Sequence, residues 1–127
     1  GSLMIWTVRI VRSLLGLLFL FASVTYLFHL ITPPPPVGAM KVFDDGMRIS
    51  RYMLPTVKAL ELLCGLALLS GRFVPLALVV LAPIVVNIVG VHLVLAPEGL
   101  PVAGFVLLAT LFLAWHHRSA YLPLLRP

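Results

Sequence analysis

The chain has 127 residues, of which 61% are hydrophobic and only 10% are charged, and its mean hydropathy is +1.14. A soluble domain of this length has too small an interior to bury so much apolar surface, which excludes the soluble globular class. The net charge of +5 comes from basic residues scattered at segment ends, without a cluster or an aromatic platform, and this argues against nucleic acid as a partner.

Charged residues are absent from three long segments, residues 13–40, 73–97 and 99–117. The first two exceed the roughly 20 residues that a helix needs to cross ~30 Å of hydrocarbon, and the third is just long enough. A fourth segment, residues 52–71, has a similar apolar frame with a few charges. The pattern predicts an all-α integral membrane protein, a bundle of four transmembrane helices in contact with the lipid bilayer.

The first helix is expected over about residues 10–31 of a single membrane domain, residues 3–127, and residues 1–2 are taken as an expression scar. The prolines of TPPPP end this helix because they lack amide donors and hold an extended geometry. Residues 32–54 then form an outer loop. The loop either is disordered in solvent or contains a short interfacial helix that carries Met40, Phe43, Met47 and Tyr52.

Three further helices follow the loop in close succession. Pro55 suits the first turn of a helix over residues 55–70, which Gly71 closes. The next helix spans residues 73–95 and is expected to kink at Pro83, whose ring interrupts a backbone hydrogen bond. After the turn APEGLP, the fourth helix covers residues 101–117.

Four spans place both chain ends on one side of the membrane. That side carries five arginines and no acidic residue, whereas the opposite side mixes three basic with three acidic residues. The positive-inside rule therefore predicts that both termini are cytoplasmic. The five arginines are Arg9, Arg12, Arg72, Arg118 and Arg126.

The polar residues of the predicted spans share one leaflet. The alternating directions of the first three helices put their polar positions in the outer half of the bundle, while the inner half is almost wholly Leu, Val, Ala and Phe. Polar groups in hydrocarbon are expensive and mark functional sites by default. We expect a small-molecule site built from Tyr26, His29, Lys58, Glu61, Asn87 and His92.

Glu61 is the most informative of these residues, since a carboxylate at such depth costs at least ~2.5 kcal/mol unless it is paired or protonated. Lys58 lies three residues earlier on nearly the same helical face, so an ion pair is geometrically available. Two interpretations stay open. Either the pair only holds the bundle together, or Glu61 handles protons or binds a ligand, helped by His92 or His29.

Asn87 and His92 are five residues apart and project about 140° from each other on an ideal helix, so they reach different neighbours. An interhelical hydrogen bond is the ordinary role for Asn87. His92 acts either as an interfacial or helix-capping residue or as a proton relay.

The remaining candidates have structural explanations. Cys64, the only cysteine, excludes an intrachain disulfide and electron transfer through an internal cysteine pair, and it is expected to be a small buried residue. No metal site is predicted, because the histidines and Glu61 come from separate helices without a ligand spacing signature. Close helix approach is expected at Gly16, Ala22, Gly65, Gly71, Gly90 and Gly104.

Four stretches carry a family resemblance: GLLFLFASVTYLFHL, LPTVKALELLCGLALLSGRFVPLAL, LAPIVVNIVGVHLVLAPEGLP and FLAWHHRSAYLPLL. Their motifs are Lys58-x-x-Glu61 followed by Gly65, Arg72-Phe73-Val74-Pro75, and Pro83-x-x-x-Asn87-x-x-x-x-His92. In this order and spacing the chain resembles the DoxX-like family of small four-helix bacterial membrane proteins.

The resemblance implies a multi-pass protein of the bacterial inner membrane but no single reaction. The family takes its name from association with a membrane thiosulfate:quinone oxidoreductase, some members are linked to redox-stress systems, and distant animal relatives resemble assembly chaperones or cargo receptors. Family members often have an Asn-Lys pair in the first helix where this chain has Thr25-Tyr26, so a positive charge is missing here. Fold does not determine function.

Together these observations predict a redox-linked subunit that binds a quinone or another lipophilic molecule, with Glu61 and His92 exchanging protons with the ligand or hydrogen-bonding it. No electron carrier is visible in the sequence, so redox chemistry would need the bound quinone or a partner subunit. The alternative is a non-catalytic accessory, assembly or chaperone-like protein whose outer loop meets a membrane or periplasmic partner. The sequence leaves open whether the chain is an enzyme and whether it forms a homodimer.

Overall fold

A computed structural model of the chain describes residues 2–30 and 35–125. Over these residues it has helices and turns and no strand: α1 (Ser2–Leu27), α2 (Gly38–Ile49), α3 (Met53–Ser70), α4 (Val74–Val94), the 3-10 turn η1 (Pro97–Gly99), α5 (Leu100–His116), α6 (Arg118–Tyr121) and η2 (Leu122–Leu125). Four stretches are long and apolar enough to cross a membrane, namely α1, α3, α4 and the η1–α5 unit. The predicted all-α bundle of four membrane-spanning helices is therefore confirmed.

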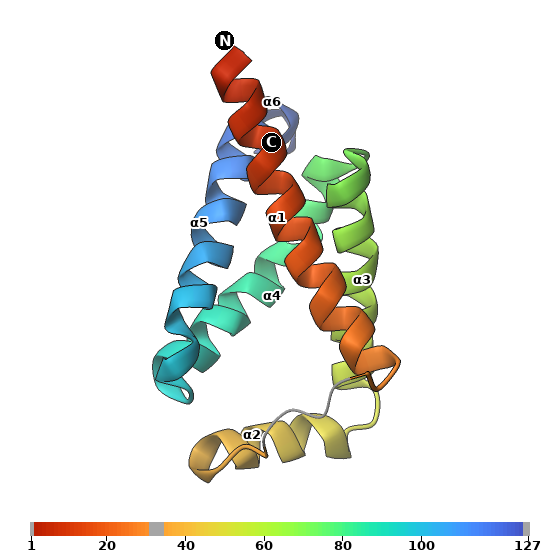
Figure 1. Ribbon diagram of the computed structural model, residues 1–127, viewed down its shortest axis with the longest axis vertical. Coiled ribbons are helices and arrows are strands. Elements are labelled where there is room, and N and C mark those ends of the chain that lie inside the picture. Colours follow the sequence, from red (N-terminus) through yellow and green to blue (C-terminus); the bar gives the residue numbers. More distant parts are fainter. Residues whose placement is uncertain (1, 31–34, 126–127) are drawn as a thin grey trace.

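The four long helices form a closed ring of contacts, with α1 against α3, α3 against α4, α4 against α5, and α5 against α1. Both ends of the described chain lie at one end of this bundle, and α2 lies across the opposite end (Figure 1). We call these the terminal end and the α2 end. Both termini lie at the same end because the chain crosses the bundle an even number of times.

The first helix differs from its prediction at both ends. It begins at Ser2 rather than near Ile10, because residues 2–9, which are mostly apolar, continue the same helix. It ends at Leu27, and the following turn places His29 at a left-handed φ of 55°. The residue that was predicted to end the helix, Ile31, lies outside the described residues.

The segment predicted as an outer loop contains a regular helix, α2, so a wholly disordered loop is the wrong alternative. Its apolar side chains fall on one arc of the helix and its four charged side chains on the other, as in helices that lie in a membrane interface. Arg48 donates from Nε to Asp44 Oδ2 over 2.8 Å, one turn away on the charged arc. Tyr52 lies beyond α2 and precedes α3.

The later helices begin and end close to the predicted positions. Gly71 closes α3 at a left-handed φ of 75°, which a residue without a Cβ adopts readily. α4 continues as one helix through Pro83. The tail after α5 is helical, and the Tyr121 hydroxyl donates to the Pro75 carbonyl over 2.8 Å, which ties the tail to the start of α4.

Two glycines set the closest helix crossing, between α1 and α3. A Cβ on Gly65 would lie 3.0 Å from the Leu20 amide nitrogen and 3.1 Å from the Gly16 carbonyl oxygen. Both neighbours are backbone atoms, so the two helices touch without intervening side chains. By contrast, a Cβ on Gly90 or Gly104 would meet no atom within 4 Å, so the prediction of close approach is wrong at these two positions.

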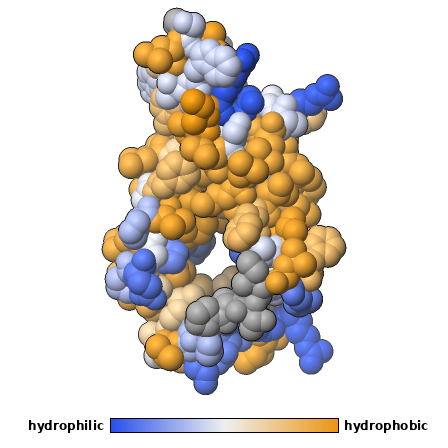
Figure 2. Space-filling model, viewed as in Figure 1, coloured by the Kyte–Doolittle hydropathy of each residue, from blue (hydrophilic) through white to orange (hydrophobic). Residues whose placement is uncertain are grey.

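The core runs along the centre of the bundle, where Leu15, Phe19, Leu68, Leu81 and Leu113 are all at most 1% exposed. Cys64 joins this core as a buried free cysteine, as predicted. Around it, large apolar side chains cover the outside of the helices, and hydrophilic residues gather toward the two ends (Figure 2). An apolar belt of this kind is the surface that a lipid bilayer covers.

Candidate functional site

A cavity of about 340 Å³ lies between α2, α3 and α4 at the α2 end of the bundle. Its volume falls in the range of small-molecule sites, and its wall is mostly apolar with a few polar groups, which is the usual composition of such sites. In Figure 2 the molecule is hollowed between the bundle and α2. The lining residues are Phe43, Met47, Met53, Leu54, Val57, Lys58, Glu61, Ile84, Asn87, Ile88 and Val91.

Glu61 provides the only carboxylate of this wall. The residue is 4% exposed, and its Oε2 lies 3.2 Å from the Lys58 Nζ, so the predicted ion pair is present. Lys58 Nζ is the polar group that faces this oxygen among the described residues. Glu61 is thus a buried carboxylate that depends on one counter-charge beside an apolar cavity, an expensive arrangement.

Asn87 faces the same cavity from α4. Its amide nitrogen donates to the Pro83 carbonyl over 2.9 Å, within its own helix. The expected interhelical bond is therefore not the bond that Asn87 makes, since its amide binds a carbonyl one turn back in its own helix. The bond uses one amide hydrogen and leaves the side-chain oxygen as an acceptor at the cavity wall.

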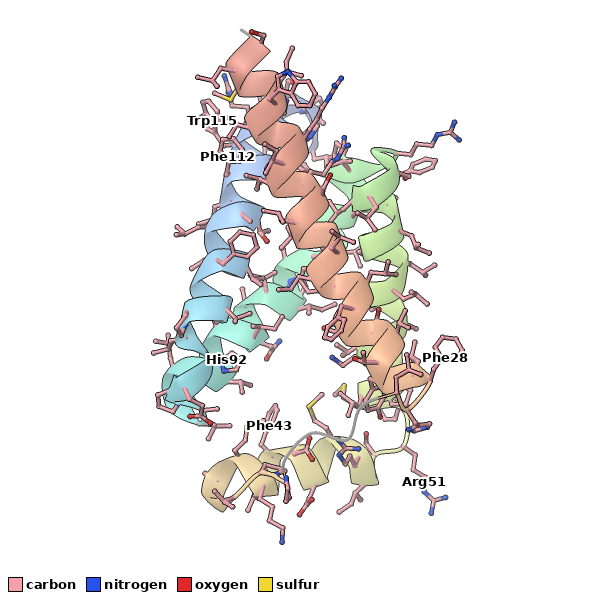
Figure 3. All side chains as sticks on the ribbon, in the orientation of Figure 1. Phe28, Phe43, Arg51, His92, Phe112 and Trp115 are labelled. Carbon is pink, nitrogen blue, oxygen red and sulfur yellow. The ribbon has the colours of Figure 1, made fainter. Side chains whose placement is uncertain are left out.

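His92 lies beyond the cavity, at the junction of α4 and η1 (Figure 3). Its Nδ1 is 3.0 Å from the Ala96 carbonyl oxygen, and a Cβ on Gly99 would overlap its ring. The imidazole thus packs into the turn and hydrogen-bonds the backbone at the helix end. Of the two roles left open for His92, this geometry matches helix capping.

Two predicted site residues on and after α1 lie at or outside the edge of the cavity. His29 is exposed, and its ring is 6.5 Å from that of Tyr26. The Tyr26 ring in turn lies 6.0 Å from the Lys58 Nζ and 5.8 Å from the Arg48 guanidinium carbon. The structure therefore brings Lys58, Glu61 and Asn87 together, with Tyr26 beside Lys58, and it leaves His29 and His92 out of the lining.

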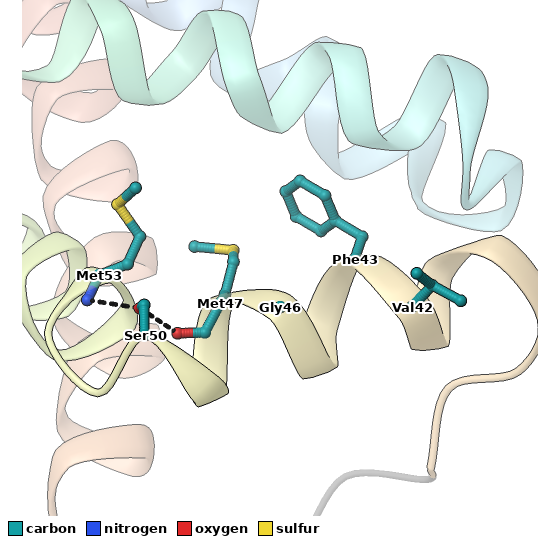
Figure 4. A pocket seen from close by; sticks show the side chains of 6 residues that line it. All are labelled: Val42, Phe43, Gly46, Met47, Ser50 and Met53. Carbon is teal, nitrogen blue, oxygen red and sulfur yellow. Dashed lines mark hydrogen bonds between the residues drawn. The ribbon is translucent and has the colours of Figure 1, made fainter.

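A second cavity, about 290 Å³, opens along α2 and shares Phe43, Met47 and Met53 with the first. These three side chains point from α2 and the start of α3 toward the bundle (Figure 4). The turn between the two helices is tied by Ser50, whose hydroxyl donates to the Met47 carbonyl over 2.7 Å and accepts from the Met53 amide over 3.2 Å. α2 thus provides one apolar wall for both cavities.

Sequence reasoning did not assign the apolar lining residues to the site. For α2 the signal was present, because Met40, Phe43 and Met47 recur at the spacing of one helical face. For α4 no signal separates Ile84 and Ile88 from the residues that face lipid, since every face of that helix is apolar.

The site offers donors and acceptors but no metal-ligand cluster. Among residues 2–30 and 35–125, no group of three or more His, Cys, Asp and Glu side chains could hold a metal ion. Lys58 can donate to a ligand oxygen, while Glu61 and the Asn87 oxygen can accept from a ligand O–H or N–H. The arrangement therefore suits an apolar molecule with a few polar atoms at one end.

Comparison with known proteins identifies the family. The family model described as DoxX matches residues 7–95, which is more than half of the chain and includes most of α1 and all of α2, α3 and α4. No curated protein and no solved structure shows a significant match. The match covers the cavity's three helices with Lys58, Glu61 and Asn87 among them, and the chain belongs to the DoxX family of membrane proteins.

Proposed function

We propose that this DoxX-family protein binds a lipophilic small molecule of the quinone class in the cavity between α2, α3 and α4. One observation carries the proposal: the buried Glu61 carboxylate, with Lys58 as its counter-charge, belongs to the wall of an otherwise mostly apolar cavity. A structural ion pair alone needs no adjacent space, whereas a ligand site needs both the space and the polar group.

The polar groups around the cavity match the chemistry of a quinone or quinol head. A quinone has carbonyl acceptors that the Lys58 ammonium serves, and a quinol has hydroxyl donors that Glu61 and the Asn87 oxygen accept. The apolar wall from Ile84 and Ile88 suits the ring and its substituents. The chain holds one cysteine and no metal cluster among its described residues, so it would act as a redox-linked subunit whose electrons belong to the ligand or to a partner.

The test is a binding titration of a short-chain ubiquinone into the purified protein in nanodiscs. The expected result is saturable binding that weakens about tenfold in Glu61→Gln and in Lys58→Met, because each change removes a charged hydrogen-bonding group. His29→Asn is the matched control, since His29 is polar and at the same end but outside the lining, and asparagine tolerates its left-handed backbone. If the native chain and the three variants bind ubiquinone with equal affinity, the assignment of the site is wrong.

A second candidate is an accessory protein that meets a membrane or periplasmic partner through α2. The observation that favours it is the exposure of Val42 and Ile49, which are 73% and 78% exposed at the edge of the apolar arc of α2. Replacing both with serine keeps the wall of the 340 Å³ cavity and removes the exposed apolar edge. Loss of a native complex on blue native gels with unchanged ubiquinone affinity would favour this function over the first.

The proposal also includes the orientation of the protein in the membrane. Four arginines lie in the half of the bundle near the terminal end, which supports cytoplasmic termini and a cavity in the outer leaflet: Arg9, Arg12, Arg72 and Arg118. Arg126 lies outside the described residues. Cysteine labelling from either side of inverted vesicles, with single cysteines at Ser2 and Lys41 in a Cys64→Ala background, tests this assignment.

A further inference from the structure

The terminal end of the bundle concentrates positive charge without an acidic side chain. This end of the bundle carries four arginines, together with His116 and His117 at the end of α5. The sequence has only four acidic side chains, and all of them lie elsewhere: two in α2, one in α3 beside the cavity and one in η1. The arginines are Arg9, Arg12, Arg72 and Arg118.

Arg12 differs from its neighbours in how its guanidinium is held. Arg9 lies 5.6 Å from the ring centroid of Trp6, and Arg118 lies 4.7 Å from that of Trp115 while its Nη1 donates to the Trp115 carbonyl over 2.9 Å. These two arginines are stacked on aromatic rings. The Arg12 Nε, by contrast, is buried and has no hydrogen-bond partner among the described residues.

The position of Arg12 at the end of α3 does not supply that partner. Its guanidinium lies so close to Gly71 that a Cβ there would be 2.8 Å from Nη1. The Ala67 carbonyl there already accepts from both the Gly71 amide and the Ser70 hydroxyl, each over 3.0 Å, and the Arg12 Nε has no hydrogen bond to this helix end. Favourable placement near a helix carboxyl end explains why the charge is tolerated, but a buried N–H still requires an acceptor.

His117 follows α5, which packs against the helix that carries Arg12. Burial lowers the pKa of His117, and repulsion from His116 and from the Arg12 charge lowers it further. α1, the end of α3 and the end of α5 therefore bring N–H donors and positive charge together without an acidic side chain among the described residues.

The depth of this region indicates where the acceptor comes from. Trp6 and Trp115 are 60% and 51% exposed on the same helix ends, and tryptophans on the outside of membrane helices lie at headgroup level. Arginine recognises phosphate through paired N–H donors, and clustered basic residues at helix ends attract anionic lipids.

We propose that Arg12 and His117 bind the phosphate group of an anionic phospholipid at the terminal end of the bundle, between α1, α3 and α5. The site is separate from the cavity at the α2 end and does not depend on the proposed quinone-class ligand. Its ligand class is a phosphodiester with net negative charge, held by the guanidinium from one side and by the imidazole from the other.

Native mass spectrometry of the detergent-purified protein tests the proposal. The probes are phosphatidylglycerol, phosphatidylcholine and inorganic phosphate, titrated separately. We expect phosphatidylglycerol to bind at least about tenfold more tightly than phosphatidylcholine, about a tenfold loss in Arg12→Gln and a smaller loss in His117→Gln, consistent with charge-assisted bonds to one phosphate. Arg9→Gln is the control that removes the same charge at the same end, and it should change the affinity less than about twofold.

Three outcomes would overturn the proposal. Equal losses in Arg12→Gln and Arg9→Gln would mean diffuse attraction to the cationic end and no site. Equal binding of the two lipids would remove the anionic specificity. Displacement of phosphatidylglycerol by millimolar inorganic phosphate, dependent on Arg12, would assign the site to free phosphate instead of a lipid. Arg12→Lys keeps the charge and serves as a second variant if the glutamine variant does not fold.

Discussion

At the scale of single residues, Lys58 and Glu61 determine the character of the cavity. The pair lies on a membrane-spanning helix, with side chains 20% and 5% exposed and 3.2 Å between Nζ and Oε2. A buried ion pair is a weak stabiliser compared with well-packed apolar residues, but removing one partner leaves the other uncompensated. The pair is therefore better explained by what it offers a ligand than by the stability it adds.

Lys58→Met should lower the free energy of unfolding by about 3 kcal/mol, because the Glu61 carboxylate is then left buried without its counter-charge. Lys58→Met with Glu61→Leu should recover most of this loss, since both charges are gone. Lys41→Met, at an exposed position of α2, is the control and should be neutral. Thermal unfolding in detergent measures all three, and an unchanged midpoint for Lys58→Met would contradict the pairing.

A pH effect is expected from His117. Burial and neighbouring cations lower its pKa below the ordinary value of 6.5, so the unfolded chain takes up the proton more readily than the folded one. The free energy of unfolding is therefore highest above pH 6.5, and it declines as the pH falls from there through the pKa of His117 in the folded chain. The decline is small because the ring is only partly buried.

Thermal midpoints between pH 7.5 and pH 5.5 in zwitterionic detergent should show this decline in the native chain and a weaker one in His117→Gln. His29→Asn, an exposed histidine at the α2 end, should keep the native pH profile. A His117→Gln profile that matches the native one would assign the pH effect to other groups.

At the scale of helices, the α1–α3 crossing is the tightest contact in the bundle. Gly65→Ala places a Cβ 3.0 Å from the Leu20 nitrogen and 3.1 Å from the Gly16 oxygen, and backbone atoms cannot turn aside as a side chain can. The two helices must separate, at a cost of about 1–3 kcal/mol.

Gly104→Ala is the matched control, since a Cβ there meets no atom within 4 Å. It should leave the thermal midpoint in detergent unchanged or raise it slightly, because alanine favours a helix. Equal destabilisation by the two substitutions would show that the crossing is not held by close backbone packing.

The sequence predicted the helices well where long uncharged segments indicate them, and it predicted the start of the first helix poorly. The four spans follow from long uncharged segments, and Gly71 ends α3 as predicted. The start of α1 was predicted too late, because Arg9 and Arg12 were taken to mark the end of the apolar span, whereas the helix continues through them to Ser2.

The sequence indicates the depth of the site residues in the membrane but not the direction in which each side chain points. Depth along the helices brought Lys58, Glu61 and Asn87 to the same level, but depth says nothing about rotation around a helix axis. That rotation turns Asn87 to the cavity and His92 into the η1 turn. The contribution of Phe43 depends on α2 folding back across the bundle, which no local pattern specifies.

At the scale of the whole molecule, the two ends have different chemistry. The α2 end combines the apolar wall of an amphipathic helix with the Lys58–Glu61 pair, whereas the terminal end is cationic and carries exposed tryptophans. An apolar belt between them fixes the protein in the bilayer. The central claim is that the α2 end holds a lipophilic ligand.

Photo-crosslinking with a diazirine-bearing ubiquinone analogue in nanodiscs, followed by peptide mapping, tests this claim most directly. We expect labels concentrated at residues 43–61 and 84–91, removed by excess unlabelled ubiquinone and reduced in Glu61→Gln. Labels spread over the outer faces of α1 and α5, unaffected by competitor or by Glu61→Gln, would contradict it.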